Sequence, residues 1–124
     1  MIGYVTLGTN NLEKASQFYD ALFATIGGAR AFETDMFIAW GKSANAPAMS
    51  VTKPFDGEAA TAGNGVMVAI GVDSADKVDA FHAKALELGG SDEGAPGLRV
   101  GNFYAGYFRD LDGNKLNAFC IVKE

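Results

Sequence analysis

Apolar and polar residues follow the same order twice along this chain. Alternation in residues 2–8 predicts a strand, and an apolar stripe spaced by three or four residues predicts a helix after it. The stripe consists of Ala15, Phe18, Tyr19, Leu22 and Phe23. Residues 66–72 and 75–88 repeat this order. The pattern therefore predicts two copies of one strand–helix unit.

The two copies coincide when the chain is shifted by 63 residues, which places Tyr4 on Met67. A Gly-Gly pair follows each predicted helix, and glycine readily adopts the left-handed conformation that ends a helix. Packed face to face, two such copies can form a cleft. Any two strand–turn–helix units share part of this pattern, but identical residues also coincide at four places: Val5 with Val68, Gly8 with Gly71, Lys14 with Lys77, and Phe18 with Phe81.

Helix caps and short strands complete each predicted copy. Asn10 or Asn11 can cap the first helix, and Asp73 or Ser74 the second, because short polar side chains accept the free N–H groups of a first turn. Short apolar runs between turn residues predict three strands after each helix. These lie near Arg30–Glu33, Met36–Gly41 and Ala48–Lys53, and near Ser91–Glu93, Phe103–Arg109 and Lys115–Val122.

Three segments without this periodicity are predicted to connect the strands. Pro54–Gly65 is rich in Gly, Ala and Pro and is the expected connector between the copies. Gly94–Gly101 is expected to be a long loop, and Asp112-Gly113 a tight hairpin turn. We therefore expect a single domain, residues 1–124, with a first module at about 1–55 and a second at about 65–124.

Composition and charge exclude several classes of protein. Of the 124 residues, 48% are hydrophobic and 20% charged, as is typical of a globular domain. The net charge of −5 disfavours a nucleic-acid partner, since phosphate binding needs a basic face. No apolar run approaches the roughly 18 residues of a membrane span, and the N-terminus lacks signal-peptide features. Cys120, the only cysteine, cannot form an internal disulfide, so a cytoplasmic location is expected.

Two segments carry a family resemblance: Val5–Tyr19, with its Lys-Ala and Phe-Tyr pairs, and Tyr107–Leu116, which contains Asp-Leu-Asp-Gly-Asn. With the repeated order of elements, they resemble the vicinal oxygen chelate superfamily, which includes glyoxalases, bleomycin-resistance proteins, extradiol dioxygenases and fosfomycin-resistance enzymes. The resemblance implies an α+β fold of two βαβββ modules whose mixed sheets form a concave cleft, with the helices outside. Leu111 replaces the proline that is common in the family's hairpin.

The resemblance also implies where a divalent metal ion would bind. Family members hold it with His, Gln or Glu at the opening of the first strand and on the last strand of each module. Here those positions carry Tyr4, Met67 and Asn117, while the last strand of the first module offers Ala48, Met49 and Ser50. A thioether is soft, a phenol ionises near pH 10, and an amide is uncharged. No metal cofactor is therefore expected, and a divalent ion at a non-standard site is the alternative.

His82, the only histidine, coincides with Tyr19 in the repeat and lies on the second predicted helix. Because the resemblance places helices outside the cleft, we expect a surface or half-buried residue rather than a catalytic one.

Residues expected to face the cleft from the strands are aromatic, methionine or polar, the usual lining of a small-molecule pocket. Phe37, Met49 and Phe119 are expected to be core residues. Aromatic rings with polar tips offer stacking or cation–π contacts to a ligand. The predicted ligand-binding residues are Tyr4, Trp40, Met67, Tyr104, Tyr107 and Asn117.

The expected function is metal-free binding of a small molecule, aromatic or cationic, of the bleomycin-resistance type. A first alternative is a glyoxalase-like lyase or dioxygenase with a non-standard metal site. A second is a non-catalytic dimeric structural or regulatory module. The resemblance further implies a homodimer, swapped or unswapped. The sequence identifies no catalytic residue and leaves open whether the protein is an enzyme.

Overall fold

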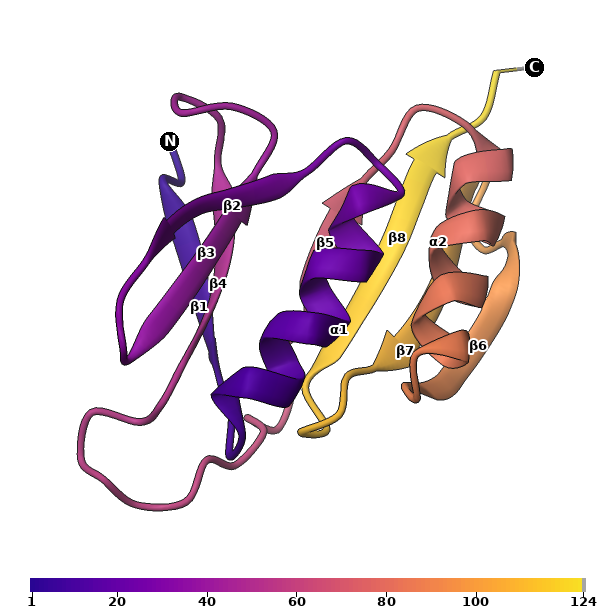
Figure 1. The fold of residues 1–124 in the computed structure, drawn as a ribbon. Helices are drawn as coiled ribbons and strands as arrows, with labels where there is room; N and C mark the ends of the chain where they lie inside the picture. The colour runs from indigo at the N-terminus through magenta and orange to yellow at the C-terminus, as the bar shows by residue number, and fades with distance from the viewer. Residues whose placement is uncertain (124) are drawn as a thin grey trace.

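The computed structural model describes residues 1–123 as two βαβββ modules (Figure 1). Glu124, the last residue of the second predicted module, lies outside the described residues. None of the helices in the described part is both long and apolar enough to cross a membrane. The first module contains β1 (Tyr4–Gly8), α1 (Leu12–Ala24), β2 (Ala29–Glu33), β3 (Phe37–Gly41) and β4 (Ala48–Thr52). The second contains β5 (Val68–Gly71), α2 (Ala75–Glu87), β6 (Ser91–Leu98), β7 (Phe103–Arg109) and β8 (Lys115–Ile121).

Each module forms its own open, four-stranded mixed sheet. The strand orders are β1-β4-β3-β2 and β5-β8-β7-β6, so the second sheet repeats the first. In each sheet the first strand pairs with the last in parallel, and the other pairs are antiparallel. The predicted α+β fold of two βαβββ modules is confirmed.

Both helices begin and end as their sequences predict. The Asn11 side chain accepts a hydrogen bond from Lys14 N at 3.0 Å, and Ser74 caps α2 in the same way. Gly27 and Gly89, with φ of 81° and 105°, follow the two helices in the left-handed conformation.

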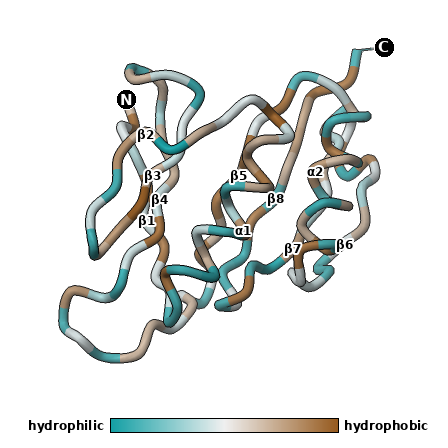
Figure 2. Tube along the Cα trace, in the orientation of Figure 1, coloured by the Kyte–Doolittle hydropathy of each residue, from teal (hydrophilic) through white to brown (hydrophobic). Residues whose placement is uncertain are grey.

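One hydrophobic core joins the two modules. Each helix packs its apolar stripe on one face of its own sheet, and α1 also contacts α2. The rings of Phe23 and Phe81 lie 6.1 Å apart between the helices. Figure 1 shows α1 between the first sheet and the second module, and Figure 2 shows hydrophobic residues on the strands beside it. Each sheet therefore has a helix-packed face and an opposite face without a helix, here called its helix-free face.

The prediction that Gly94–Gly101 forms a loop is wrong as far as Leu98, because β6 continues through this segment. β6 lies at the edge of its sheet and pairs only with β7, so Pro96 interrupts no second ladder. The register shifts between Asp92 and Gly94 and again between Gly94 and Gly97. These irregularities accommodate glycine and proline in a strand that the period-two pattern does not reveal.

The two segments that carry the family resemblance contact each other. The Tyr19 hydroxyl on α1 donates to Asp110 Oδ2 at 2.6 Å, and both residues are buried. Asp110 also accepts the backbone N–H groups of Asp112 and Asn114, and the Asn114 amide donates to Gly8 O at 2.9 Å. We call Tyr19, Asp110 and Asn114 the inter-module cluster, because their bonds tie the turn of the second module to the first.

Candidate functional site

The resemblance places the family's metal ligands at the opening of the first strand and on the last strand of each module, and the strand register selects one of the three candidates on β4. Thr6 pairs with Ser50, and Ala69 pairs with Asn117. A shift of 63 residues carries Thr6 onto Ala69, so Ser50 is the counterpart of Asn117. The four positions are therefore Tyr4 and Ser50 in the first module, and Met67 and Asn117 in the second.

Four of the six predicted ligand-binding residues lie at these positions or directly beside one of them. Tyr4 and Met67 flank the outer edges of the sheets, with exposed fractions of 64% and 40%. Tyr107 and Asn117 are cross-strand partners on the helix-free face of the second sheet. Tyr4 therefore belongs to the first sheet, whereas Met67, Tyr107 and Asn117 belong to the second module, and each sheet is open.

The other two, Trp40 and Tyr104, point to the helix-packed faces instead, and their role in ligand binding stays a prediction. Trp40 donates its indole N–H to Asp20 Oδ1 on α1 at 2.8 Å. The Tyr104 hydroxyl donates to Asp79 Oδ1 on α2 at 2.6 Å, and this bond raises the pKa of Tyr104. Both rings therefore extend from the helix-packed faces, where their polar tips have protein partners.

The helix-free faces of the two modules differ in how their polar groups are satisfied. In the first module, Ser50 Oγ lies 2.7 Å from Thr6 Oγ1 and 3.0 Å from Val5 O, within hydrogen-bond distance of both. In the second, Asn117 is only 1% exposed, and its Oδ1 has no hydrogen-bond partner in the described part of the chain. A buried carbonyl oxygen without a donor is costly, and among the described residues Asn117 Oδ1 is the buried side-chain atom left with an unused capacity to accept a hydrogen bond.

Sequence analysis missed two cations beside Asn117. Lys115 Nζ and Arg99 Cζ lie 5.5 and 5.3 Å from the centroid of the Tyr107 ring. Lys115 could have been found from the alternation along β8, since it precedes Asn117 by two residues. Arg99 follows the irregular strand β6, where no sequence period predicts which way a side chain points.

The four corresponding side chains do not fit a divalent ion. They supply a phenol, a thioether, a neutral amide and a hydroxyl that already has protein partners, with no carboxylate or imidazole among them. Within residues 1–123, no cluster of three or more His, Cys, Asp or Glu side chains could hold a metal ion.

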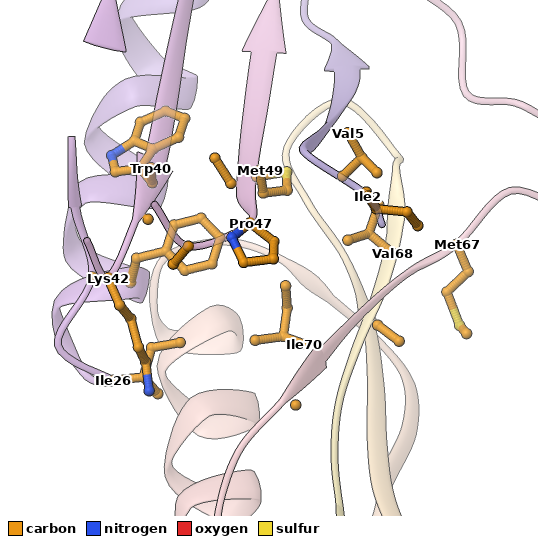
Figure 3. Close-up of a pocket in the computed structure, with 17 residues that line it drawn as sticks. Ile2, Val5, Ile26, Trp40, Lys42, Pro47, Met49, Met67, Val68 and Ile70 are labelled. Carbon is orange, nitrogen blue, oxygen red and sulfur yellow. The ribbon is translucent and has the colours of Figure 1, made fainter. Parts of the chain in front are cut away.

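A pocket of about 660 Å³ lies between the modules (Figure 3). Its lining is apolar apart from Lys42 and includes Val5, Trp40, Met49 and Ile70. Most of these side chains extend from the helix-packed faces, and the pocket reaches the edge strand β5 of the second sheet, where Ala69 also lines it. Met67 lies at its outer end (Figure 3).

His82 is buried, with 5% exposure, so the expectation of a surface or half-buried residue is wrong. Its Nε2 lies 3.1 Å from both Asp92 Oδ1 and Tyr107 O, which places the ring between α2 and the second sheet. Cys120 is also buried on the helix-packed side, and burial raises the pKa of its thiol.

Comparison with known proteins agrees with this fold. The family model of the Glyoxalase/Bleomycin resistance protein/Dioxygenase superfamily matches residues 1–118, and the chain belongs to this superfamily. A glyoxalase/bleomycin resistance protein from Albidiferax ferrireducens T118 is similar in structure, with a TM-score of 0.89, 36% identity, and coverage of 97% of this chain and 98% of that one.

Two further structures share the fold at lower identity. A hypothetical protein from S. aureus has a TM-score of 0.76 and 25% identity, covering 97% of this chain and 92% of its own. A glyoxalase/bleomycin resistance protein/dioxygenase family enzyme from Burkholderia phytofirmans PsJN has a TM-score of 0.79 and 18% identity, covering 97% of this chain and 98% of that one. No curated protein sequence matches the chain.

Proposed function

We propose that the protein binds a small organic molecule without a metal ion, on the helix-free faces of its sheets. The observation that carries this proposal is the buried, unpartnered Oδ1 of Asn117 at a position where metal-dependent relatives hold an ion. An amide cannot supply the charge that holds a divalent cation, but its oxygen accepts a hydrogen bond from an organic ligand. Tyr107 beside it offers an aromatic surface.

We further propose that a homodimer completes the cleft. β1 and β5 each lie at a sheet edge, where unpaired backbone groups are available to another strand. Apolar residues that flank both edges are exposed by 40% to 64%: Ile2, Tyr4, Val66 and Met67. The apolar pocket between the modules opens beside these edges. Pairing of β1 with β5 of a second copy would bring Tyr4 and Ser50 of one chain beside Met67 and Asn117 of the other.

Metal content and ligand binding test the first proposal together. Protein purified without chelator is expected to contain no stoichiometric divalent ion by plasma mass spectrometry, and its melting temperature should rise with aromatic small molecules. A stoichiometric, tightly bound ion would instead favour a lyase or dioxygenase with a non-standard site.

Light scattering after size-exclusion chromatography tests the dimer. Ile2→Lys places a charge in the apolar pocket at an exposed position and is expected to shift the population toward monomer. Phe55→Lys is the matched control, because Phe55 is fully exposed on the connector and lies outside that pocket. Equal effects of the two variants, or a wild-type monomer, would contradict the dimer.

A further inference from the structure

We propose that the helix-free face of the second module selects an organic acid that also carries a hydroxyl or amino donor next to its carboxylate. This inference rests on the proposed binding function and specifies the class of ligand. Although the chain carries a net charge of −5, which favours cationic ligands, the charge on this face is positive.

Two cations lie close to the Tyr107 ring. Arg99 Cζ and Lys115 Nζ are 5.3 and 5.5 Å from the ring centroid, within the range of cation–π contacts. Within the described chain, neither forms an ion pair, whereas nearby Arg109 pairs with Glu93 at 2.9 Å. Arg99 and Lys115 therefore leave positive charge available to an anion.

The position of Arg99 depends on two glycines of β6. A Cβ atom at Gly97 would lie 3.1 Å from one terminal nitrogen of Arg99, and a Cβ at Gly94 would lie 3.3 Å from both the other nitrogen and the Tyr107 ring. Gly94 also has a φ of 153°, which side chains rarely adopt. The absence of side chains at these positions lets the guanidinium lie close to the strand and beside the ring.

Asn117 adds a second requirement. Lys115 and Asn117 are two residues apart on β8, so their side chains leave the same face with a separation of about 7 Å along the strand. The unpartnered Oδ1 of Asn117 is an acceptor and needs an N–H or O–H donor. A ligand whose carboxylate contacts these cations must therefore present a donor close to that carboxylate to bond with Asn117.

An apolar surface continues the face beyond Asn117. Phe119, which we expected to be a core residue, is instead the partly exposed next residue of β8 on this side. Its ring stacks on Phe103 with centroids 5.3 Å apart. The face thus runs from cations through an acceptor to aromatic rings. Phenyllactate has the same order of groups: a carboxylate, a neighbouring hydroxyl and a phenyl ring.

Isothermal titration calorimetry with three probes tests the charge and the donor separately. Phenyllactate is expected to bind, phenylpropionate, which lacks the hydroxyl, to bind about tenfold more weakly, and phenethylamine not to bind. Raising the salt concentration should weaken phenyllactate binding. Tighter binding of the amine than of either acid, or no binding of phenyllactate at millimolar concentration, would overturn the inference.

Variants assign each effect to its residue. The double variant Arg99→Gln/Lys115→Gln is expected to lose at least about tenfold in affinity for both acids, while Lys53→Gln, at an exposed lysine of the other module, should not. Asn117→Leu should remove the preference for phenyllactate over phenylpropionate. Unchanged affinities in these variants would also overturn the inference.

The outcomes separate this inference from the function on which it rests. Binding of the amine to metal-free protein would overturn the ligand class but support metal-free binding. Acid binding that depends on Arg99 and Lys115, in protein that holds a stoichiometric divalent ion, would support the ligand class and overturn the metal-free function.

Discussion

The two modules share one topology, yet the side chain at the same helical position has different hydrogen-bond partners in each. Tyr19 on α1 and His82 on α2 coincide in the repeat, and both are buried. Tyr19 bonds to Asp110 in the other module, whereas Nε2 of His82 lies within hydrogen-bond distance of Asp92 and Tyr107 O in its own. A repeated scaffold thus needs only one copy to supply the bond that joins the modules, and the other copy is free to use that position internally.

The helix-free faces differ in the same sense. In the first module, Ser50 and Thr6 are within hydrogen-bond distance of each other. In the second, Asn117 has no partner within residues 1–123, and Lys115 lies beside it without an ion pair there. Among the described residues, the buried side-chain polar atom without a partner therefore lies on the second module, which is the module that we propose selects the ligand.

Asp110→Ala is expected to give the largest effect on this comparison. The change removes the acceptor for Tyr19, for two backbone N–H groups and for one bond of Asn114, and leaves buried donors unpaired. The free energy of unfolding, measured by urea denaturation, should fall by about 3–4 kcal/mol.

Asp92→Ala is the matched control, because Asp92 is the exposed carboxylate that faces His82. Its loss should be much smaller, since solvent can replace an exposed partner. Equal losses of unfolding free energy in the two variants would show that the inter-module cluster does not stabilise the protein more than an exposed contact does.

Tyr19→Phe is expected to lower stability by about 1–2 kcal/mol near neutral pH. It should also change the pH dependence. Burial first, and then the charge of Asp110, raise the pKa of Tyr19 well above its usual range, so the folded state keeps this proton more tightly than the unfolded state. That contribution is complete below about pH 10 and is lost as the pH rises further through the folded-state pKa.

Denaturation of wild type and Tyr19→Phe between pH 8 and pH 11 tests whether stability falls as the pH rises, because these limits lie roughly around the tyrosine pKa. The variant should lose less stability across the range, although Tyr104, whose pKa is also raised, keeps part of the alkaline decline. His82→Gln at the matching position should leave the alkaline decline unchanged. A steeper decline in Tyr19→Phe would contradict the proposed role of the hydroxyl proton.

Asp20→Asn is expected to give the smallest effect. Asp20 accepts two hydrogen bonds from Arg30 and one from Trp40 Nε1, and the Arg30 bond lowers the pKa of this carboxyl. The ion pair is partly exposed, so solvent screening limits its contribution to about 0.5 kcal/mol. A lowered folded-state pKa stabilises the protein above the unfolded value, near pH 4, and this contribution disappears as the pH falls through the folded-state pKa.

Tryptophan fluorescence during denaturation measures this contribution directly at Trp40. The measurement is made at pH 7 and pH 3, which lie roughly on either side of the carboxyl pKa. The difference between wild type and Asp20→Asn should be present at the higher pH and smaller at the lower. A difference that grows on acidification would contradict the assignment.

The architecture was predictable because its signals are local and repeated. The apolar stripes, the caps at Asn11 and Ser74 and the glycines after each helix all agree with the fold that forms. β6 was not predictable beyond Glu93, because Pro96 and the glycines contradict strand propensity, and an irregular edge strand tolerates them.

The candidate site could be predicted only where strand alternation assigned side chains to one face of the sheet. Choosing residues by their aromatic or polar type was not sufficient. Tyr104 and Tyr107 are three residues apart, so in a regular strand they leave opposite faces, and only Tyr107 can accompany Asn117. Trp40 attracted attention as an aromatic residue with a polar tip, but Asp20, twenty positions earlier in the chain, satisfies that tip. A contact between residues so distant in sequence has no periodic signature.

The bonds from Tyr19 to Asp110, and from Asn114 to Asp110 and Gly8 O, join the two segments that carry the family resemblance. The stretches by which such a chain is recognised serve to assemble the scaffold, so any descendant that still folds has reason to retain them. Substitutions at Asn117 and the three corresponding positions can change the chemistry of the site without changing the inter-module cluster. A match to these stretches therefore reports a shared scaffold, and the reaction or ligand must be inferred from the side chains at the four positions on the helix-free faces.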